Sequence, residues 1–223
     1  MTIVMPEYIA DTEALIETAR IDDPDDRERF LELIQAAESR PGAAAYERRV
    51  VEALDGDDVI IGSVTFRARP LSRLFTTGEV VYPYVATCGL KMAEFGGALT
   101  DELEKYWWDI IMLDAVGKAR IALRDEIGRI AGYEPVSVNP GSIEMWPVSN
   151  QPALFSLIGD VGSSIGVTIA PSFLMIPLKS VSGIFFRGSG GEGSFTHNCS
   201  LCERENCPNR AAPFDANLKA MLS

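Results

Sequence analysis

The chain has 223 residues, of which 47% are hydrophobic and 23% are charged, and its net charge is −12. This length supports one sizeable hydrophobic core but is short for two, so we expect one domain with an appendage. An acidic surface repels phosphate backbones, which argues against a nucleic-acid partner. The chain has no run of about 18 apolar residues and lacks a signal-peptide pattern at its start, so we expect a cytoplasmic protein without a membrane partner.

The acidity is concentrated near the N-terminus, where residues 1–60 contain 16 acidic and 6 basic side chains. This region is predicted to be helical over 1–58. Asp11 is placed to cap a helix with an apolar stripe, and Asp23-Pro24 is a typical start for a second helix. A third helix is predicted at about 43–54.

Strands are predicted next, at residues 59–67 and at 79–87. Pro83 indicates that the second of these strands is irregular or lies near a sheet edge. From about residue 100, acidic residues followed by apolar residues at helical spacing predict a long helix that reaches about residue 126. A short helix at 152–158 and a strand-like stretch at 165–178 follow.

The stretch RGSGGEGS at 187–194 has the composition of a flexible linker. We therefore divide the chain into a body at 1–187 and a tail at 188–223. The tail contains three of the four cysteines within nine residues, Cys199, Cys202 and Cys207, and the only histidine, His197. In a cytosolic protein such a cluster indicates a metal site and not disulfides, whereas the isolated Cys88 is expected to be a buried apolar side chain.

The spacing C-x2-C-x4-C leaves three interpretations of the tail. Three thiolates suit a [4Fe-4S] cluster whose fourth ligand comes from elsewhere, and Cys207-Pro208 is a common pair in iron–sulfur motifs. Cys199, Cys202, Cys207 and His197 together would suit a tetrahedral zinc ion. The third interpretation is three free thiols.

Several reaction classes lack their characteristic residues. The only histidine belongs to the cysteine cluster, so a Ser-His-Asp or Cys-His mechanism would have to use an expected metal ligand. The glycine-rich stretch lacks the pattern of a phosphate-binding loop. We therefore expect neither a hydrolase nor a nucleotide triphosphatase.

Two blocks of sequence resemble the activation domain of cobalamin-dependent methionine synthase and its stand-alone anaerobic relatives with a C-terminal three-cysteine motif. The first block is Val138-Asn139-Pro140-Gly141-Ser142, followed by Trp146 and ALFSLI. The second block is Pro177-Leu178-Lys179-Ser180-Val181-Ser182-Gly183. With the passage from VATCG into the long helix, the resemblance covers most of residues 45–187.

The resemblance implies an α+β domain with a twisted antiparallel sheet flanked by helices, here followed by a short metal-binding tail. It also implies a function, which is to return an oxidised corrinoid cofactor to its active state. In that reaction an electron reduces the corrinoid, and S-adenosylmethionine supplies a methyl group. Methylation traps the reduced cobalamin, and binding both molecules side by side supplies proximity. The cofactor-binding residues that the two blocks imply are Asn139, Pro140, Gly141, Ser142, Lys179, Ser180 and Ser182.

This sequence departs from the family motif at two positions, with Ser137 in place of an arginine and Ser142 in place of a tyrosine. An arginine would bind the methionyl carboxylate through two hydrogen bonds that serine cannot replace, which counts against S-adenosylmethionine binding. We therefore expect electron delivery through the tail to a corrinoid on a partner protein, with a further protein as electron donor. The alternatives are the family's S-adenosylmethionine-dependent reductive methylation and a non-catalytic adaptor that docks a corrinoid methyltransferase through a zinc tail.

Overall fold

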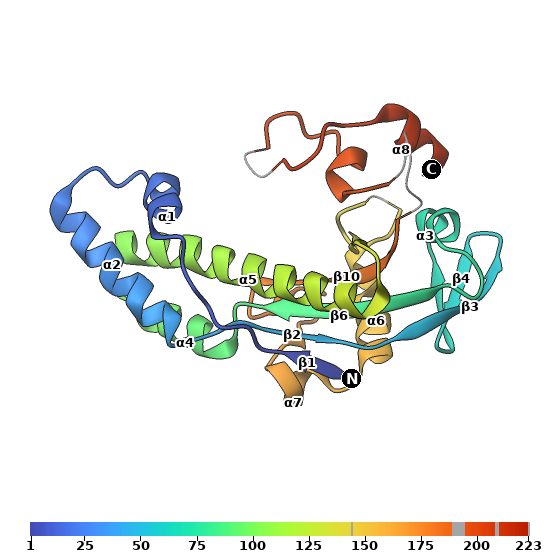
Figure 1. The fold of residues 1–223 in the computed structure, drawn as a ribbon, viewed down its shortest axis with the longest axis horizontal. Helices are drawn as coiled ribbons and strands as arrows, with labels where there is room; N and C mark the ends of the chain where they lie inside the picture. Colours follow the sequence, from blue (N-terminus) through green and yellow to red (C-terminus); the bar gives the residue numbers. More distant parts are fainter. Residues whose placement is uncertain (144, 189–194, 208–209, 223) are drawn as a thin grey trace.

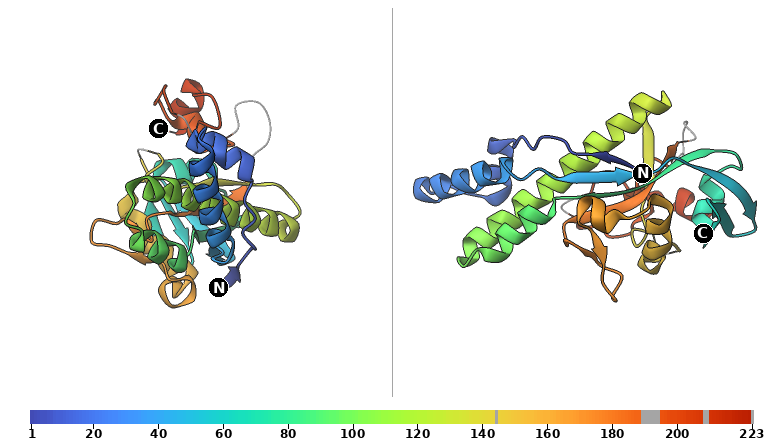
Figure 2. Two further views of the ribbon diagram at one scale, coloured as in Figure 1. Left: turned by 90° about the vertical axis from the view of Figure 1, so that its left-hand side faces the viewer. Right: turned by 90° about the horizontal axis from the view of Figure 1, so that it is seen from below.

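The computed structural model of the protein describes residues 1–143, 145–188, 195–207 and 210–222. The described strands form an antiparallel sheet of eight strands and a separate two-stranded hairpin, with helices on both faces of the sheet (Figures 1 and 2). This arrangement confirms the predicted α+β class. The sheet strands are β1 (Thr2–Val4), β2 (Ala43–Tyr46), β3 (Arg49–Asp55), β4 (Asp58–Ile61), β5 (Val64–Arg67), β6 (Val80–Thr87), β7 (Pro135–Val138) and β10 (Ser180–Arg187).

The helices differ greatly in length. They are α1 (Thr12–Ala19), α2 (Pro24–Glu38), α3 (Arg69–Leu74), α4 (Leu90–Ala98), α5 (Glu102–Ala131), α6 (Gln151–Ile158), α7 (Val161–Ile165) and α8 (Ala216–Leu222), with short 3-10 turns η1 (Val148–Asn150) and η2 (Asn198–Leu201). The predicted caps are confirmed, because Asp11 accepts a hydrogen bond from the Ala14 amide and Asp23 caps α2. The long predicted helix is confirmed as α5, which continues five residues beyond the expected end.

The prediction of a helix at 43–54 is wrong, because this segment forms β2 and most of β3. All four residues of β2 are buried, with Ala44 packed against α5 and Ala45 against α6 and α7. Small side chains let helices approach a central strand from both faces, and here this packing overrides the helix preference of alanine. The N-terminal region is therefore helical only between residues 12 and 38, and it also contains the short strand β1.

Strand β6 is the centre of the sheet, because it pairs with β10 on one side and with both β2 and β3 on the other. Of the two alternatives predicted from Pro83, an irregular strand or an edge position, the edge position is therefore wrong. The two residues that separate β2 from β3 lie opposite Pro83, and its carbonyl accepts a hydrogen bond from the Glu47 amide there. A proline fits this central strand because its nitrogen, which has no hydrogen, falls at the gap between two partner strands.

The long helix α5 connects two parts of the molecule. Its N-terminal half packs with α1, α2 and α4 into a helical arm around Trp107, Trp108 and Phe30 (Figure 1). Its C-terminal half lies on the sheet, where Ala119 and Leu123 pack against residues of β2, β6 and β10. The opposite face of the sheet is covered by α6 and α7.

The predicted strand at 165–178 contains only the hairpin strands β8 (Thr168–Ile169) and β9 (Met175–Ile176). The predicted linker at 187–194 lies mostly outside the described residues. Beyond it, Phe195, Leu218 and Leu222 are buried in the same hydrophobic cluster as Leu71 and Phe186 of the body. The described part of the tail is therefore docked on the body (Figure 1).

No helix in the described part of the chain is both long and apolar enough to cross a membrane.

Candidate functional site

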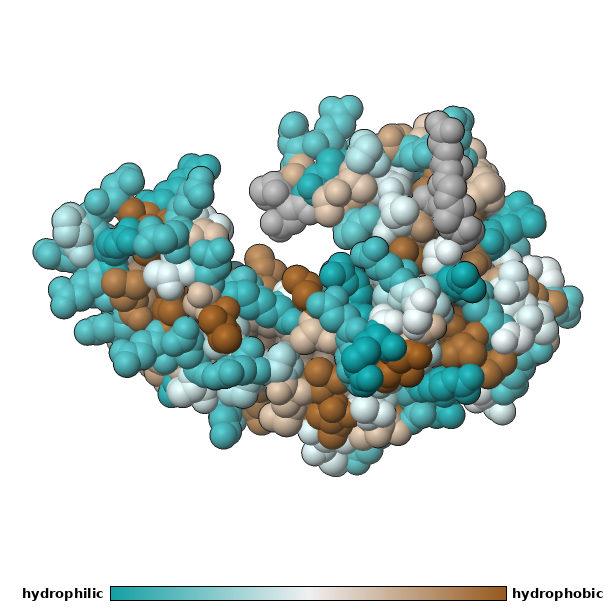
Figure 3. All heavy atoms as spheres, in the orientation of Figure 1, coloured by the Kyte–Doolittle hydropathy of each residue, from teal (hydrophilic) through white to brown (hydrophobic). Residues whose placement is uncertain are grey.

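A cavity of about 510 Å³ lies between α5, the Asn139–Ser142 loop and the first turn of the tail. Figure 3 shows the surface hollowed between the helical arm and the C-terminal segment, with hydrophobic side chains exposed at the bottom of the hollow. The cavity is lined by Leu113, Val116, Gly117, Arg120, Asn139, Gly141, Ser142, Val181, His197, Asn198, Cys199 and Cys202. It therefore brings together three regions that are far apart in the sequence.

A network of hydrogen bonds centred on Asn139 fixes the back of this cavity. The Asn139 amide donates to the Tyr84 hydroxyl at 2.9 Å and to the Ser182 carbonyl at 2.6 Å, while its oxygen accepts from the Ser137 hydroxyl at 3.2 Å. Tyr84 and Ser137 also share a 2.8 Å hydrogen bond. A buried network that satisfies its members in this way holds the loop in one position relative to β6 and β10.

Gly183 of the Lys179–Gly183 block is required by this network. A Cβ atom at position 183 would lie 2.6 Å from the Val138 carbonyl and would also overlap the Asn139 amide nitrogen. Asn139 can reach across β10 only because residue 183 has no side chain. The two blocks of the sequence therefore meet at Gly183 and Asn139.

The tail joins the same network through Asn198. Its amide donates to Asn139 Oδ1 at 2.6 Å and to the Ser137 carbonyl at 3.3 Å. The side-chain oxygen Oδ1 of Asn198 and the Ser182 hydroxyl are buried and have no hydrogen-bond partner among the described atoms. A buried polar atom without a partner is costly, so these two atoms are exceptions in a network that is otherwise satisfied.

Arg120 of α5 is a charged residue of this site that the sequence did not reveal. Its Nε donates to the Tyr84 hydroxyl at 3.4 Å, so the guanidinium lies on the same tyrosine that contacts Ser137. Arg120 forms no ion pair with another described residue. Burial lowers the pKa of His197, and the positive charge of Arg120 lowers it further. A guanidinium is thus present beside position 137, but it comes from a helix and not from the loop.

The cysteines of the tail are half-buried and lie around a loop that Arg210 holds together. Arg210 donates to the carbonyls of Cys199 at 3.2 Å and Cys202 at 3.0 Å and also to that of Arg204, while its own amide donates to the Cys207 carbonyl at 3.2 Å. Cys199 and Cys202 line the cavity, and Cys207 does not. In the described ranges, no group of three His, Cys, Asp or Glu side chains is gathered closely enough to hold a metal ion.

His197, which we proposed as a zinc ligand, caps the turn that begins the tail. Its Nδ1 accepts a hydrogen bond from the Cys199 amide at 3.1 Å. Only Nε2 of the ring is then left to bind a metal, so His197 already has a structural role.

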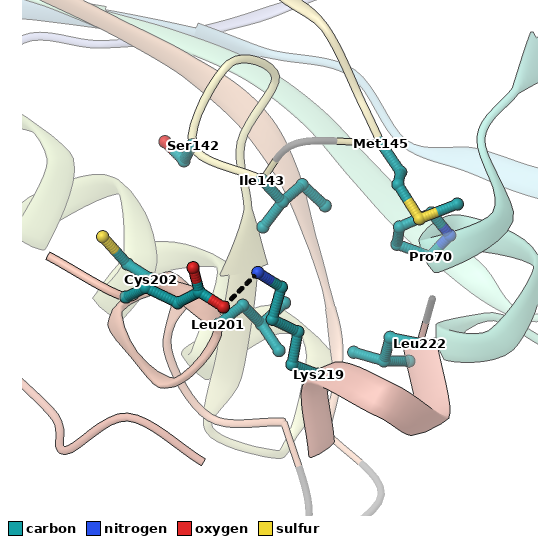
Figure 4. A pocket seen from close by; sticks show the side chains of 9 residues that line it. Pro70, Ser142, Ile143, Met145, Leu201, Cys202, Lys219 and Leu222 are labelled. Atoms are coloured by element: carbon teal, nitrogen blue, oxygen red, sulfur yellow. Dashed lines mark hydrogen bonds and ion pairs between the residues drawn. The ribbon is translucent and has the colours of Figure 1, made fainter. Parts of the chain in front are cut away.

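Cys202 also lines a second, smaller cavity of about 250 Å³ beneath the tail. Figure 4 shows Cys202 and Ser142 on one side of it and Pro70, Met145 and Leu222 on the other. The ion pair between Lys219 and Glu203, at 2.8 Å, lies at its wall. This cavity follows the seam where the tail rests on the body.

Lys179 and Ser180, two further predicted cofactor ligands, do not line the main cavity. Lys179 Nζ forms an ion pair with Asp109 at 2.9 Å. The Ser180 hydroxyl donates to the Pro177 carbonyl at 2.7 Å and shares a 2.9 Å hydrogen bond with the Thr87 hydroxyl. These contacts hold the start of β10 against β6 and α5. Cofactor binding by these two residues stays a prediction.

Cys88 is buried, as predicted, and does not contribute to the site. Its thiol lies beneath the helical arm, and burial raises its pKa to about 11.

No protein-family model and no curated protein matches the sequence. Among solved structures, the crystal structure of the MetH reactivation domain bound to AdoHcy is similar to this chain, with a TM-score of 0.54 and 14% sequence identity. The match covers 83% of this chain and 78% of that chain. At this identity the similarity shows a shared architecture. The protein has the fold of the MetH reactivation domain, in agreement with the resemblance in its sequence.

Proposed function

We propose that the protein reactivates a corrinoid cofactor held by a partner methyltransferase or corrinoid protein, and that its cysteine tail passes the electron. The observation that carries this proposal is the position of Cys199 and Cys202 on the wall of the cavity formed by α5 and the Asn139–Ser142 loop. The fold shared with the MetH reactivation domain supports it. The tail thus adds thiols to a site that the fold already provides.

The cysteine side chains of the tail are of the type that binds an iron–sulfur cluster. Three thiols in the order C-x2-C-x4-C are ligands of this type, and the loop that carries them is held at its backbone by Arg210. In the described structure the three thiols are not close enough together to hold a metal ion, so cluster binding would have to bring them together. Such a cluster supplies one-electron transfer at low potential, and a low-potential electron-transfer protein would provide the electron.

Contacts within this chain fix the position of the tail relative to the cavity. Asn198 joins the tail to Asn139 and thereby keeps Cys199 beside α5. Phe195, Leu218 and Leu222 anchor the rest of the tail in the core. These contacts limit the distance that the electron must cross between the tail and a corrinoid presented at the cavity.

A second function, S-adenosylmethionine-dependent methylation of the reduced corrinoid, is favoured by Arg120. Its guanidinium lies on the same tyrosine as Ser137, the position where the family has its arginine. A carboxylate bound there would have a charged partner in spite of the serine.

The experiment is the anaerobic reduction of cob(II)alamin by this protein with a reduced ferredoxin as donor. Iodomethane traps each cob(I)alamin as methylcob(III)alamin and releases iodide, so the visible spectrum of the cobalamin reports the rate. We expect Cys202→Ser to lower this rate at least about tenfold and Cys88→Ala to leave it close to wild type. An unchanged rate in Cys202→Ser would disprove electron delivery through the tail.

A further inference from the structure

A further cavity, of about 440 Å³, lies between the C-terminal half of α5, strand β7 and residues 196–197 of the tail. Arg120 and His197 line both this cavity and the main one, so the two cavities adjoin at these side chains. Arg124 lines only the further cavity, which we call the arginine cavity because two arginines belong to its wall.

The two arginines lie about one turn apart on the same side of α5. Residues four positions apart are neighbours on a helix, and like charges at this spacing repel each other and lower its stability. The chain has 32 acidic and 20 basic residues, so two arginines that share one cavity run against its overall composition. Their placement points to a negatively charged ligand between them.

Both guanidinium groups have donors that are available to a ligand. Arg120 donates only to the Tyr84 hydroxyl at 3.4 Å, and it forms no ion pair in the described part of the chain. Arg124 Nε and Nη2 donate to the Asp125 carboxylate at 3.2 Å and 3.1 Å, which leaves Nη1 without a partner among the described residues. The side chains of Arg124 and Asp125 are 41% and 62% exposed, and an ion pair this exposed contributes little to stability.

The rest of the wall fits a phosphate that is attached to an organic group. Exposed Thr196 adds a hydroxyl, and Ile121 and Val136 add apolar surface. Glu134, which is exposed, is the one carboxylate that lines the cavity, so the two guanidinium groups outnumber it. Arginine binds phosphate through paired hydrogen bonds. A phosphate has enough oxygens to accept from two guanidinium groups and a hydroxyl at once, whereas a carboxylate has only two.

We propose that Arg120, Arg124 and Thr196 bind the phosphate group of an organic phosphate in the arginine cavity. One source of this group is the corrinoid itself, because cobalamin carries a phosphodiester in the nucleotide loop that extends from its ring. A corrinoid at the main cavity would place this loop in the arginine cavity, where the two cavities adjoin at Arg120. The other source is a free phosphate ester. The corrinoid source rests on the proposed function, whereas phosphate binding as such does not.

The first test is equilibrium dialysis with cyanocobalamin and with dicyanocobinamide, which lacks the nucleotide loop and its phosphate. The wild-type protein should bind cyanocobalamin at least about tenfold more tightly, since charge-assisted hydrogen bonds are worth that factor or more. Arg124→Gln should remove this preference and leave the affinity for dicyanocobinamide unchanged. Arg129→Gln is the matched control and should keep the preference, because Arg129 lies on the same helix, pairs with Glu126 at 2.9 Å and does not line the arginine cavity.

The second test is calorimetric titration with glycerol 3-phosphate, and with glycerol as the probe without phosphate. Arg124→Gln should weaken glycerol 3-phosphate binding at least about tenfold, and Thr196→Val, which removes only the hydroxyl, should weaken it less. Binding of this ester that depends on Arg124, without a preference for cyanocobalamin, would identify a free ester as the source.

The inference is overturned if Arg124→Gln changes neither the cyanocobalamin preference nor glycerol 3-phosphate binding, or if the wild-type protein shows neither. Both measurements are made without an electron donor and without reduction of the corrinoid. Their failure is therefore distinct from a failure of cob(II)alamin reduction.

Discussion

At the scale of single residues, the site depends on the contact between Gly183 and Asn139. The Asn139 amide occupies the space where a side chain at position 183 would lie, and its hydrogen bonds connect Tyr84, Ser182 and the tail. The two sequence blocks are therefore parts of one structural unit.

Gly183→Ala should lower the free energy of unfolding by about 1–3 kcal/mol, because the new methyl group overlaps the Asn139 amide and the Val138 carbonyl. Urea denaturation measures this change. Gly97→Ala is the control, since a Cβ at this exposed helical position meets no atom within 4 Å, and it should be neutral or stabilising by up to about 1 kcal/mol. Equal stability of the two variants would contradict the overlap.

The four cysteines should differ sharply in reactivity. Burial raises the pKa of Cys88 to about 11, so at pH 8 its thiol is protonated as well as inaccessible. Alkylation of the metal-free protein followed by mass spectrometry should modify Cys199, Cys202 and Cys207 well before Cys88, which should react only on unfolding. Rapid alkylation of Cys88 in the folded protein would show that the hydrophobic cluster of the helical arm is accessible to solvent.

The residues of the candidate site were only partly predictable from the sequence. Asn139 and Gly141 could be predicted because they belong to a motif. Arg120 could not, because the sequence of a long helix does not show which of its basic residues faces a cavity. Gly117 could not be predicted either, because the open space around it is a feature of the folded structure.

At the scale of elements, the prediction failed where tertiary packing decides the structure. Alanine favours helices, but the alanines of β2 form a strand because α5 packs on one face of the sheet and α7 packs on the other. Helices with caps and a single apolar face, such as α1 and α2, were predicted correctly because their signals are local.

Helix α8 should be an anchor of the tail. Leu218 is only 3% exposed and lies in the main core, whereas Met221 of the same helix is 57% exposed. Leu218→Ala should therefore lower the free energy of unfolding by about 2–4 kcal/mol. The matched variant Met221→Ala should change it by less than about 0.5 kcal/mol. If chemical denaturation finds both variants equally stable, α8 does not pack on the body in solution.

At the scale of the whole molecule, a sheet and a helical arm share the helix α5, and the tail docks above the C-terminal half of that helix (Figure 1). The acidic N-terminal segment forms the outer helices of the arm, away from the cavity wall. The cavity therefore lies between the tail and α5, apart from the acidic outer helices of the arm.

The most direct test of this account is the iron, acid-labile sulfide and zinc content of anaerobically purified protein, together with its visible spectrum before and after dithionite. We predict stoichiometric iron and sulfide with an absorption band that dithionite bleaches, retained in Cys88→Ala and lost in Cys202→Ser. Zinc alone, or no metal, would contradict electron delivery through the tail.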